Sequence, residues 1–245
     1  MIVLLGIDDT DDASSRGTGH QARQLGKSLR EEGIADLHAI TRHQLLVDSR
    51  IDYTSRNSSA CMVLEPTQDD IASLLDFARK KLKSSSAPSS NAGVCLSELS
   101  AVHDEIQDFG RSAKNDVLAI GSARQLAEQK GMHLEGINGS GAGIIGALAA
   151  IGLHAAGNDG RFIWLPKLRE LDGGYTVEEL SKLLGVGIET ATGEEAPSSA
   201  RIQAAEWMRP IMREGRAILL AERGTQDGEL SWRFADKQTI KTLSD

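Results

Sequence analysis

The chain has 245 residues, a formal net charge of −8 and a 40% share of hydrophobic residues, which is typical of a folded globular protein and not of a disordered chain. The negative charge argues against a broad basic surface for nucleic acid. The two cysteines, Cys61 and Cys95, lie in apolar runs without Cys-x-x-Cys spacing. They therefore argue against a disulfide scaffold and a structural zinc site.

The N-terminal apolar run leads directly into Asp8 and Asp9 and lacks the basic region that opens a secretory signal. A second apolar stretch, residues 142–156, is broken by Gly146 and Gly152, contains His154 and is shorter than the roughly 20 residues of a membrane span. We therefore expect a cytoplasmic protein without a membrane partner, and we expect residues 142–156 to form a buried helix.

The first 97 residues predict six elements in the order β-α-β-β-α-β, which is the split βαβ pattern of ferredoxin-like folds. Apolar runs indicate the strands, and apolar residues at helical spacing indicate the helices. In chain order, the expected elements lie at 2–7, 19–32, 37–47, 60–64, 71–82 and 94–96.

The rest of the chain also mixes helices and strands. The expected helices are 112–129, 144–155, 177–184 and 201–208, and the expected strands are 133–137, 162–165 and a hairpin of 217–221 with 230–234. The fold class is therefore α/β (α+β), and we expect a two-layer sheet-and-helix architecture. We place a domain boundary near residue 110, between residues 1–110 and residues 111–245.

Three aspartates, Asp8, Asp9 and Asp11, follow the first expected strand. Crowded carboxylates repel one another, and a hard cation such as Mg²⁺ commonly relieves this repulsion. Strand alternation points Asp8 and Asp9 to opposite faces, so we expect Asp8 and Asp11 nearest the ion and Asp9 as a bridging or outer ligand. The alternative is a solvated acidic turn with an N-capping aspartate.

Two further segments could bind an anion. Gly17-Thr18-Gly19 precedes the first expected helix, whose N-terminal amides could hold a phosphate, although a plain loop has the same pattern. Arg56, in the polar loop 53–59, could clamp a phosphate with two hydrogen bonds. The alternative is an arginine that is simply solvated.

A second glycine cluster contains Gly139 and the pattern Gly141-x-Gly143-x-x-Gly146, which matches the dinucleotide-binding fingerprint. That fingerprint expects an acidic residue at the end of the next strand, whereas strand 162–165 is followed by Pro166 and Lys167. Two explanations of this glycine cluster remain open: it allows the helix to pack closely, or it binds an anion or a substrate. A dinucleotide-dependent oxidoreductase is the least favoured alternative.

Four segments in the same order resemble motifs of the archaeal tRNA(Ile) agmatinylcytidine synthetase (TiaS) family. The family's motifs are Gly-Ile-Asp-Asp-Thr-Asp, a loop ending in Thr-Arg-Gly-Asn, Asn-Pro-Gly-Val and a glycine-rich segment leading into Ile-Gly-Ala-Leu-Ala-Ala-Ile-Gly. The matching segments are 6–11 (GIDDTD), 53–57 (YTSRN), 91–94 (NAGV) and 138–152 (NGSGAGIIGALAAIG), so the resemblance covers about residues 1–165.

The resemblance implies an ATP-using, kinase-like N-terminal domain followed by a ferredoxin-like domain. Asp8, Asp9 and Asp11 would hold Mg²⁺ and act in catalysis. We expect His20 to act at the same site, as a phosphate contact or a proton carrier near neutral pH; the alternative is a residue that merely occupies the first turn of the helix. The turn of Gly17, Thr18 and Gly19 would hold the ATP phosphates together with Arg56 and Asn57. Gly139, Gly141 and Gly143 would shape the pocket of the acceptor substrate.

The chain departs from the family in two respects. We expect a shorter relative without the family's oligonucleotide-binding barrel and zinc ribbon, and His20 stands where the family's glycine turn carries a threonine. We therefore expect an Mg²⁺-ATP-binding enzyme that activates an oxygen of a small substrate by phosphoryl or nucleotidyl transfer, without tight tRNA binding. The alternative is a non-catalytic nucleotide- or ligand-binding regulatory protein, and assembly as a homodimer remains open.

Overall fold

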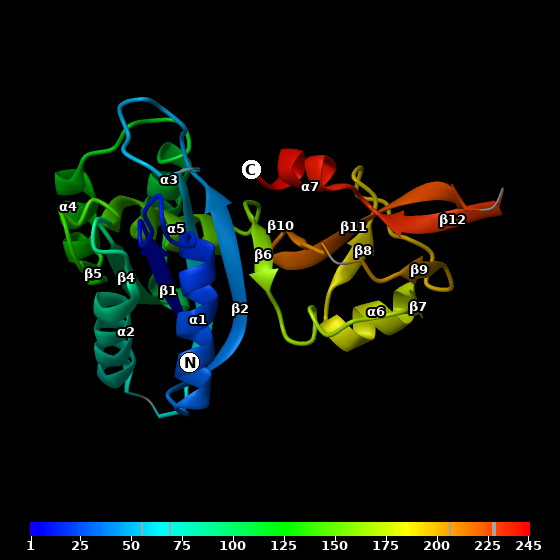
Figure 1. Ribbon diagram of the computed structural model, residues 1–245, viewed down its shortest axis with the longest axis horizontal. Helices are drawn as coiled ribbons and strands as arrows, with labels where there is room; N and C mark the ends of the chain where they lie inside the picture. Colours follow the sequence, from blue (N-terminus) through cyan, green and yellow to red (C-terminus); the bar gives the residue numbers. More distant parts are fainter. Residues whose placement is uncertain (55, 69, 206, 227–228) are drawn as a thin grey trace. The chain divides into compact units, whose positions relative to one another are not determined.

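The computed structural model describes residues 1–54, 56–68, 70–205, 207–226 and 229–245. The chain forms two compact units, Met1–Ala156 (unit 1) and Gly157–Asp245 (unit 2) (Figure 1). Within the described ranges, no helix has both the length and the apolar character needed to cross a membrane.

Unit 1 contains an antiparallel sheet with the strand order β5-β4-β1-β3-β2. The predicted β-α-β-β-α-β order of the first 97 residues is present, and a mixed α/β fold class is confirmed. The elements are β1 (Val3–Asp8), α1 (Thr18–Glu31), β2 (Ala35–Gln44), β3 (Ser58–Pro66), α2 (Ile71–Ser85) and β4 (Gly93–Glu98).

Of the helix predicted over 112–129, only the second half is present, as α4 (Ile120–Gln129). Another helix, α3 (Asp104–Ser112), ends where the predicted helix was expected to begin, and β5 (His133–Gly136) and α5 (Ile144–Ala156) follow α4. Helix α3 ends because the amides of Asn115 and Asp116 both donate to the Ser112 carbonyl. The Asn115 side chain also donates to the Arg111 carbonyl. These bonds close the helix with a turn and start a loop at Ala113.

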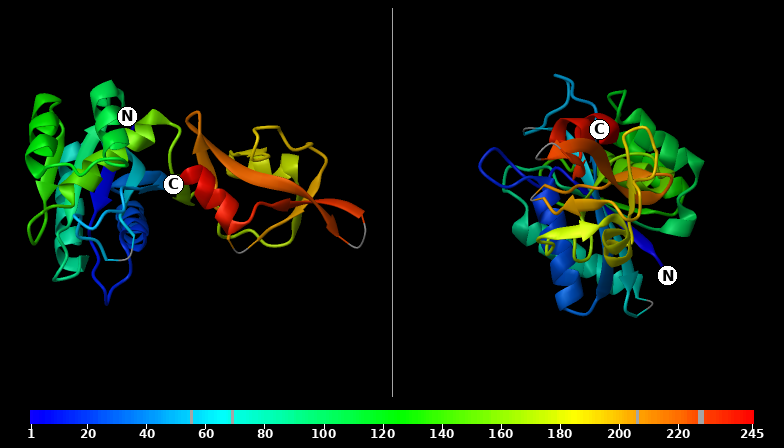
Figure 2. Two further views of the ribbon diagram at one scale, coloured as in Figure 1. Left: turned by 90° about the horizontal axis from the view of Figure 1, so that it is seen from above. Right: turned by 90° about the vertical axis from the view of Figure 1, so that its right-hand side faces the viewer.

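Helices cover both faces of the unit 1 sheet. Ile40 faces Gly26 of α1, whereas the next residue, Thr41, is hydrogen-bonded to His154 of α5. Since successive strand residues point to opposite faces, α1 and α5 lie on opposite sides of the sheet, and α2 packs beside α1 (Figure 2). Helix α5 thus adds a third layer to the expected two.

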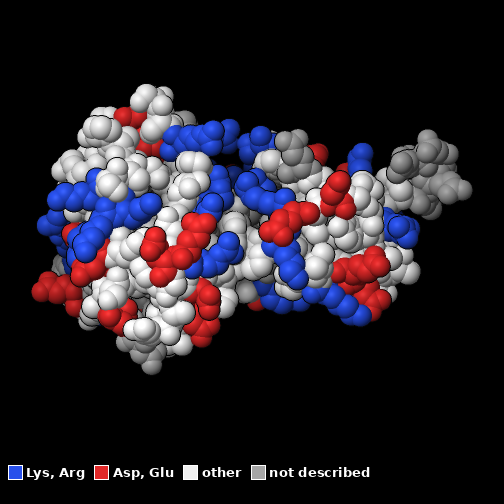
Figure 3. All heavy atoms as spheres, turned by 60° about the horizontal axis from the view of Figure 1, so that its bottom comes forward, with Lys and Arg blue, Asp and Glu red and all other residues white. Residues whose placement is uncertain are grey.

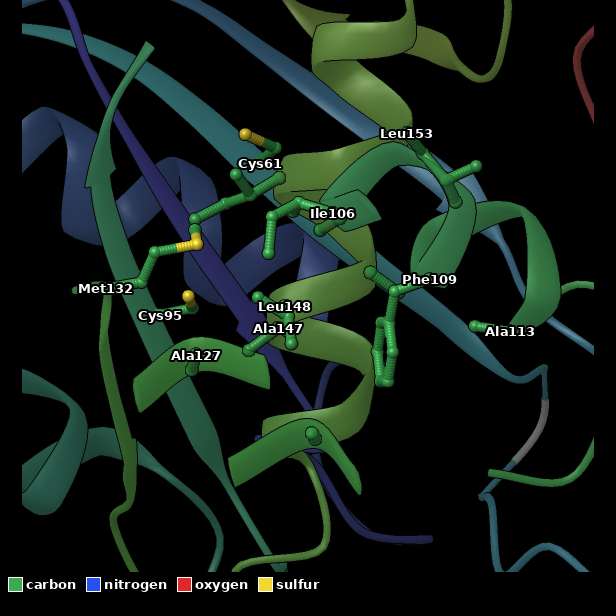
Figure 4. Close-up of a cluster of buried hydrophobic side chains, with 14 of the residues drawn as sticks. Cys61, Cys95, Ile106, Phe109, Ala113, Ala127, Met132, Ala147, Leu148 and Leu153 are labelled. Atoms are coloured by element: carbon green, nitrogen blue, oxygen red, sulfur yellow. The ribbon is translucent and has the colours of Figure 1, made fainter. Parts of the chain in front are cut away.

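Helix α5 packs directly on the strands through small residues. Its Ala147 and Leu148 lie in a buried cluster with Cys61, Cys95 and residues of α3 and α4 (Figure 4). A Cβ on Gly6 of β1 would overlap the Ala147 carbonyl. This contact joins residues 111–156 to the first strands, so the compact units divide after Ala156 and not near residue 110.

Unit 2 has a sheet in the order β6-β10-β11-β12-β9-β7, with β8 parallel to β11. The expected helix 177–184 and the hairpin of β11 and β12 are present, whereas the helix expected at 201–208 is wrong. Arg201–Gln203 instead pairs with both β7 and β12, and this buries Ile202. The elements are β6 (Arg161–Trp164), β7 (Gly174–Thr176), α6 (Val177–Leu184), β8 (Gly187–Glu189), β9 (Arg201–Gln203), β10 (Ile211–Arg213), β11 (Arg216–Gln226), β12 (Glu229–Phe234) and α7 (Lys237–Ser244).

We predict that Gly6→Ala lowers the free energy of unfolding by about 2–3 kcal/mol, because the added methyl group must push α5 away from β1. Gly121→Ala is the matched control, since a Cβ on this α4 residue meets no atom within 4 Å. The control should be neutral or stabilising by up to about 1 kcal/mol. Urea unfolding of both variants tests the prediction, and equal stabilities would contradict it.

Candidate functional site

A cavity of about 390 Å³ opens in unit 1 where β1 ends, and it brings together residues from six segments. These are the end of β1 with the residues that follow it, the start of α1, the loop 45–58, Asn91 before β4, the segment from the end of α3 to the start of α4, and the segment 140–146 at the start of α5. Of the residues singled out from the sequence, the cavity is lined by Asp8, Asp9, Asp11, Thr18, Arg56, Asn57 and Gly143.

Asp8 is the last residue of β1, and its side chain turns toward α5. Only 8% of the residue is exposed, and a Cβ on Gly146 would overlap its carboxylate. Burial and, to a smaller extent, the nearby charges of Asp9 and Asp11 raise the pKa of Asp8 to about 7, although a hydrogen bond from the Asp9 backbone and the charge of Arg42 act in the opposite direction. The site therefore holds a carboxylate whose negative charge is poorly compensated.

Asp9 follows in a conformation that residues other than glycine seldom adopt, with φ of 51°. Partial burial raises the pKa of Asp9, and the charges of Asp11 and Asp52 add to this effect. A hydrogen bond from Asn91 acts in the opposite direction. Asp8 and Asp9 thus share an excess of negative charge that a cation would relieve.

Asp11 has a different role, because its carboxylate caps the N-terminus of α1. One oxygen accepts hydrogen bonds from the Thr18 amide (2.9 Å) and the Thr18 hydroxyl (3.0 Å). The other accepts from the Thr54 hydroxyl at 2.7 Å. The N-capping alternative therefore describes Asp11, whose carboxylate lies where the helix dipole favours a negative charge.

The loop 45–58 forms one wall of the cavity and is closed at its base by Asn57. The Asn57 carbonyl accepts from the Leu45 amide, and its side chain donates to the Leu46 carbonyl at 2.7 Å. Arg56 is exposed and lines the cavity, and among the described residues no carboxylate forms an ion pair with it. Ser55, from the motif that led to Arg56, lies outside the described residues.

The second glycine cluster packs against the segment before β4. Asn91 accepts hydrogen bonds from the amide and hydroxyl of Ser140, and the Gly143 amide donates to the Asn91 carbonyl. A Cβ on Gly143 would lie 2.7 Å from both the Asp8 carbonyl oxygen and the Gly93 nitrogen. The glycine at position 143 is therefore explained by close packing of the backbones.

Five of the singled-out residues lie elsewhere. Within the part of the chain that the structure describes, the cavity lining does not include Gly17, Gly19, His20, Gly139 or Gly141. Burial and the charges of Arg16 and Arg23 lower the pKa of His20. Across the described residues, no group of three His, Cys, Asp or Glu side chains is arranged to hold a metal ion.

Several lining residues were not predicted from the sequence. Asn91 lies in the Asn91-Ala92-Gly93-Val94 segment, so its motif was visible although its role was not. Ser140 lies inside the predicted glycine cluster and is placed by Asn91. The apolar lining residues carry no local signal, because they join the cavity only through the fold; they include Leu45, Ile51, Leu118, Ile120 and Ile145.

We predict that asparagine substitutions at Asp8 and Asp11 act oppositely on stability in metal-free buffer. The pKa of Asp8 is higher in the folded protein than in the unfolded chain, so the wild type loses stability as the pH rises from about 4 through about 7. Asp8→Asn cannot ionise. Its stability relative to wild type should therefore rise by about 1 kcal/mol or more between pH 5 and pH 8.

Asp11→Asn serves as the contrast, because it weakens the cap of α1 and should cost about 1 kcal/mol. Urea unfolding of the three proteins in EDTA at pH 5 and pH 8 measures both effects. A difference between Asp8→Asn and wild type that does not change with pH would refute the assignment for Asp8.

No protein-family model matches the chain. The uncharacterized protein MJ0921 of Methanocaldococcus jannaschii is 29% identical over 153 residues, which are 62% of this chain and 49% of that protein. The chain thus spans about half the length of this curated relative.

Solved structures of TiaS (tRNAIle2 agmatidine synthetase) are similar to the chain. The apo structure matches with a TM-score of 0.55 and 24% identity, over 62% of this chain and 35% of that chain. The TiaS-tRNA(Ile2)-ATP complex matches with a TM-score of 0.54 and 25% identity, over 62% of this chain and 36% of that chain. The chain is therefore a structural relative of tRNAIle2 agmatidine synthetase over 62% of its length, as its motifs predict.

Proposed function

We propose that unit 1 binds Mg²⁺-ATP in this cavity and uses it to activate an oxygen of a small substrate by phosphoryl or nucleotidyl transfer. The observation that carries the proposal is the convergence of Asp8, Asp9 and Arg56 on one cavity of about 390 Å³, a volume within the usual range for ligand sites. Structures of the related TiaS contain ATP or its analogue AMPCPP, which supports a nucleotide as the ligand.

The carboxylate oxygens of the site are suitable ligands for an Mg²⁺ ion that binds together with phosphates. Mg²⁺ prefers oxygen ligands and usually takes only one or two carboxylates from the protein. Asp8 and Asp9 supply such carboxylates, and burial raises the pKa of both, so a cation beside them would stabilise their charged forms. The bound ion would neutralise charge on the phosphates, which eases attack on phosphorus.

The remaining residues of the site would bind the phosphates or hold neighbouring segments of the chain in place. Arg56 is free to pair with phosphate oxygens in the bidentate geometry of a guanidinium. Asp11 keeps the first turn of α1 and the loop containing Thr54 in place. The Thr18 hydroxyl is buried and donates to Asp11, so it serves this network and is not positioned as an acceptor of phosphate.

We expect saturating Mg²⁺-ATP to raise the Tm of the wild type, because a ligand that binds only the folded state stabilises it. Asp8→Asn should lose most of this rise. Asp12→Asn is the matched control, because Asp12 belongs to the same motif but its carboxylate is hydrogen-bonded to Ser14 and Ser89. The control should keep the rise.

Equal Tm rises in the wild type and Asp8→Asn would disprove the role of Asp8 at the site. Turnover is tested separately, by following ADP or AMP release with candidate small acceptors. Nucleotide binding without any release of ADP or AMP would favour the alternative of a non-catalytic regulatory protein.

We also expect weak binding of tRNA by this chain. Its net charge is −8, and acidic and basic side chains are interspersed on the face shown in Figure 3. At about physiological salt, non-specific binding should therefore have a Kd no tighter than about 1 μM. Gel-shift titration measures this, and a nanomolar Kd for one tRNA would restore tRNA as the substrate.

A further inference from the structure

One part of the lining of the unit 1 cavity, which we call its apolar end, differs in chemistry from the aspartates. Leu118 and Ile120, at the entry to α4, and Ile145, in the first turn of α5, line it. The same three side chains pack against the buried hydrophobic cluster of unit 1 and remain partly exposed. The floor of the cavity at this end is therefore an apolar extension of the core.

We propose that this apolar end binds the base of the nucleotide whose phosphates lie at Asp8 and Asp9; the proposal rests on the function inferred above for the same cavity. The two ends adjoin, because Ile145 is followed by Gly146, against which the Asp8 carboxylate lies. A ligand with a charged part and a planar apolar part can therefore contact both ends at once.

The opposite orientation is unfavourable. Phosphates placed over Leu118 and Ile120 would lose water without gaining a cation or a hydrogen-bond donor from these side chains, and burying a charge in this way is costly. A base placed there instead covers apolar side chains that are partly exposed, which is favourable. Asp116, between α3 and α4, is exposed, so its charge remains hydrated beside the base.

The loops that frame the apolar end are tied to one another. The Leu46 amide donates to the Ala113 carbonyl at 3.1 Å, which links the loop 45–58 to the loop after α3. Leu45 is buried on one side of this link, and Val117, on the other side, is 39% exposed at the rim. The apolar end is thus held in shape by backbone contacts.

The test compares Leu118→Asn with Leu126→Asn. Both are leucines that pack partly exposed on the same buried cluster, but only Leu118 lines the cavity. Calorimetric titration with Mg²⁺-ATP and with Mg²⁺-tripolyphosphate, which has no base, separates the two ends. Leu118→Asn should weaken ATP binding at least tenfold and leave tripolyphosphate binding unchanged within twofold, whereas Leu126→Asn should change neither.

Equal effects of the two variants on ATP, or loss of tripolyphosphate binding in Leu118→Asn, would overturn the base site. If the wild type binds neither compound, the proposed function itself fails.

A second measurement uses the wild type and does not depend on the variants folding. Irradiation with 8-azido-ATP, whose reactive group is on the base, should label residues 117–120 or Ile145. Labelling confined to other peptides would contradict the proposal.

Discussion

The close approach of α5 to strands β1 and β4 is the constraint on which the site depends. A Cβ on Gly6 or Gly146 would overlap atoms of the facing segment, so these backbones lie almost in contact. The end of β1 is thereby covered, and Asp8 is taken out of water, which raises its pKa. The packing that completes the core of unit 1 thus also creates the charged centre of its cavity.

Asp8 and Asp11 are three residues apart in the sequence, but their carboxylates lie in opposite electrostatic environments. Asp11 meets the amide at the N-terminus of α1, and this satisfies one of its oxygens while Thr54 satisfies the other. Asp8 faces the small residues of α5, where burial raises its pKa to about 7. One aspartate therefore stabilises the framework, and the other stores unfavourable energy that a cation can release.

The resemblance to TiaS covers 62% of the chain, about the share that unit 1 makes up. One of the TiaS structures is a complex with tRNA(Ile2) and ATP; nucleotide binding in the cavity of this protein is our proposal. In unit 2, helix α6 begins with a capping box between Thr176 and Glu179.

The sequence by itself determined the local elements and the motif that ends β1. Apolar alternation, helical spacing and turn residues act over a few neighbours, so the first six elements, α5, α6 and the late hairpin could be predicted. Strand β9 could not, because Arg201–Gln203 is extended only through its pairing with β7 and β12. Only the tertiary structure decided the unit boundary, the division of roles between Asp8 and Asp11, and the apolar end of the cavity. Each of these depends on contacts between segments far apart in the chain, which no local pattern encodes.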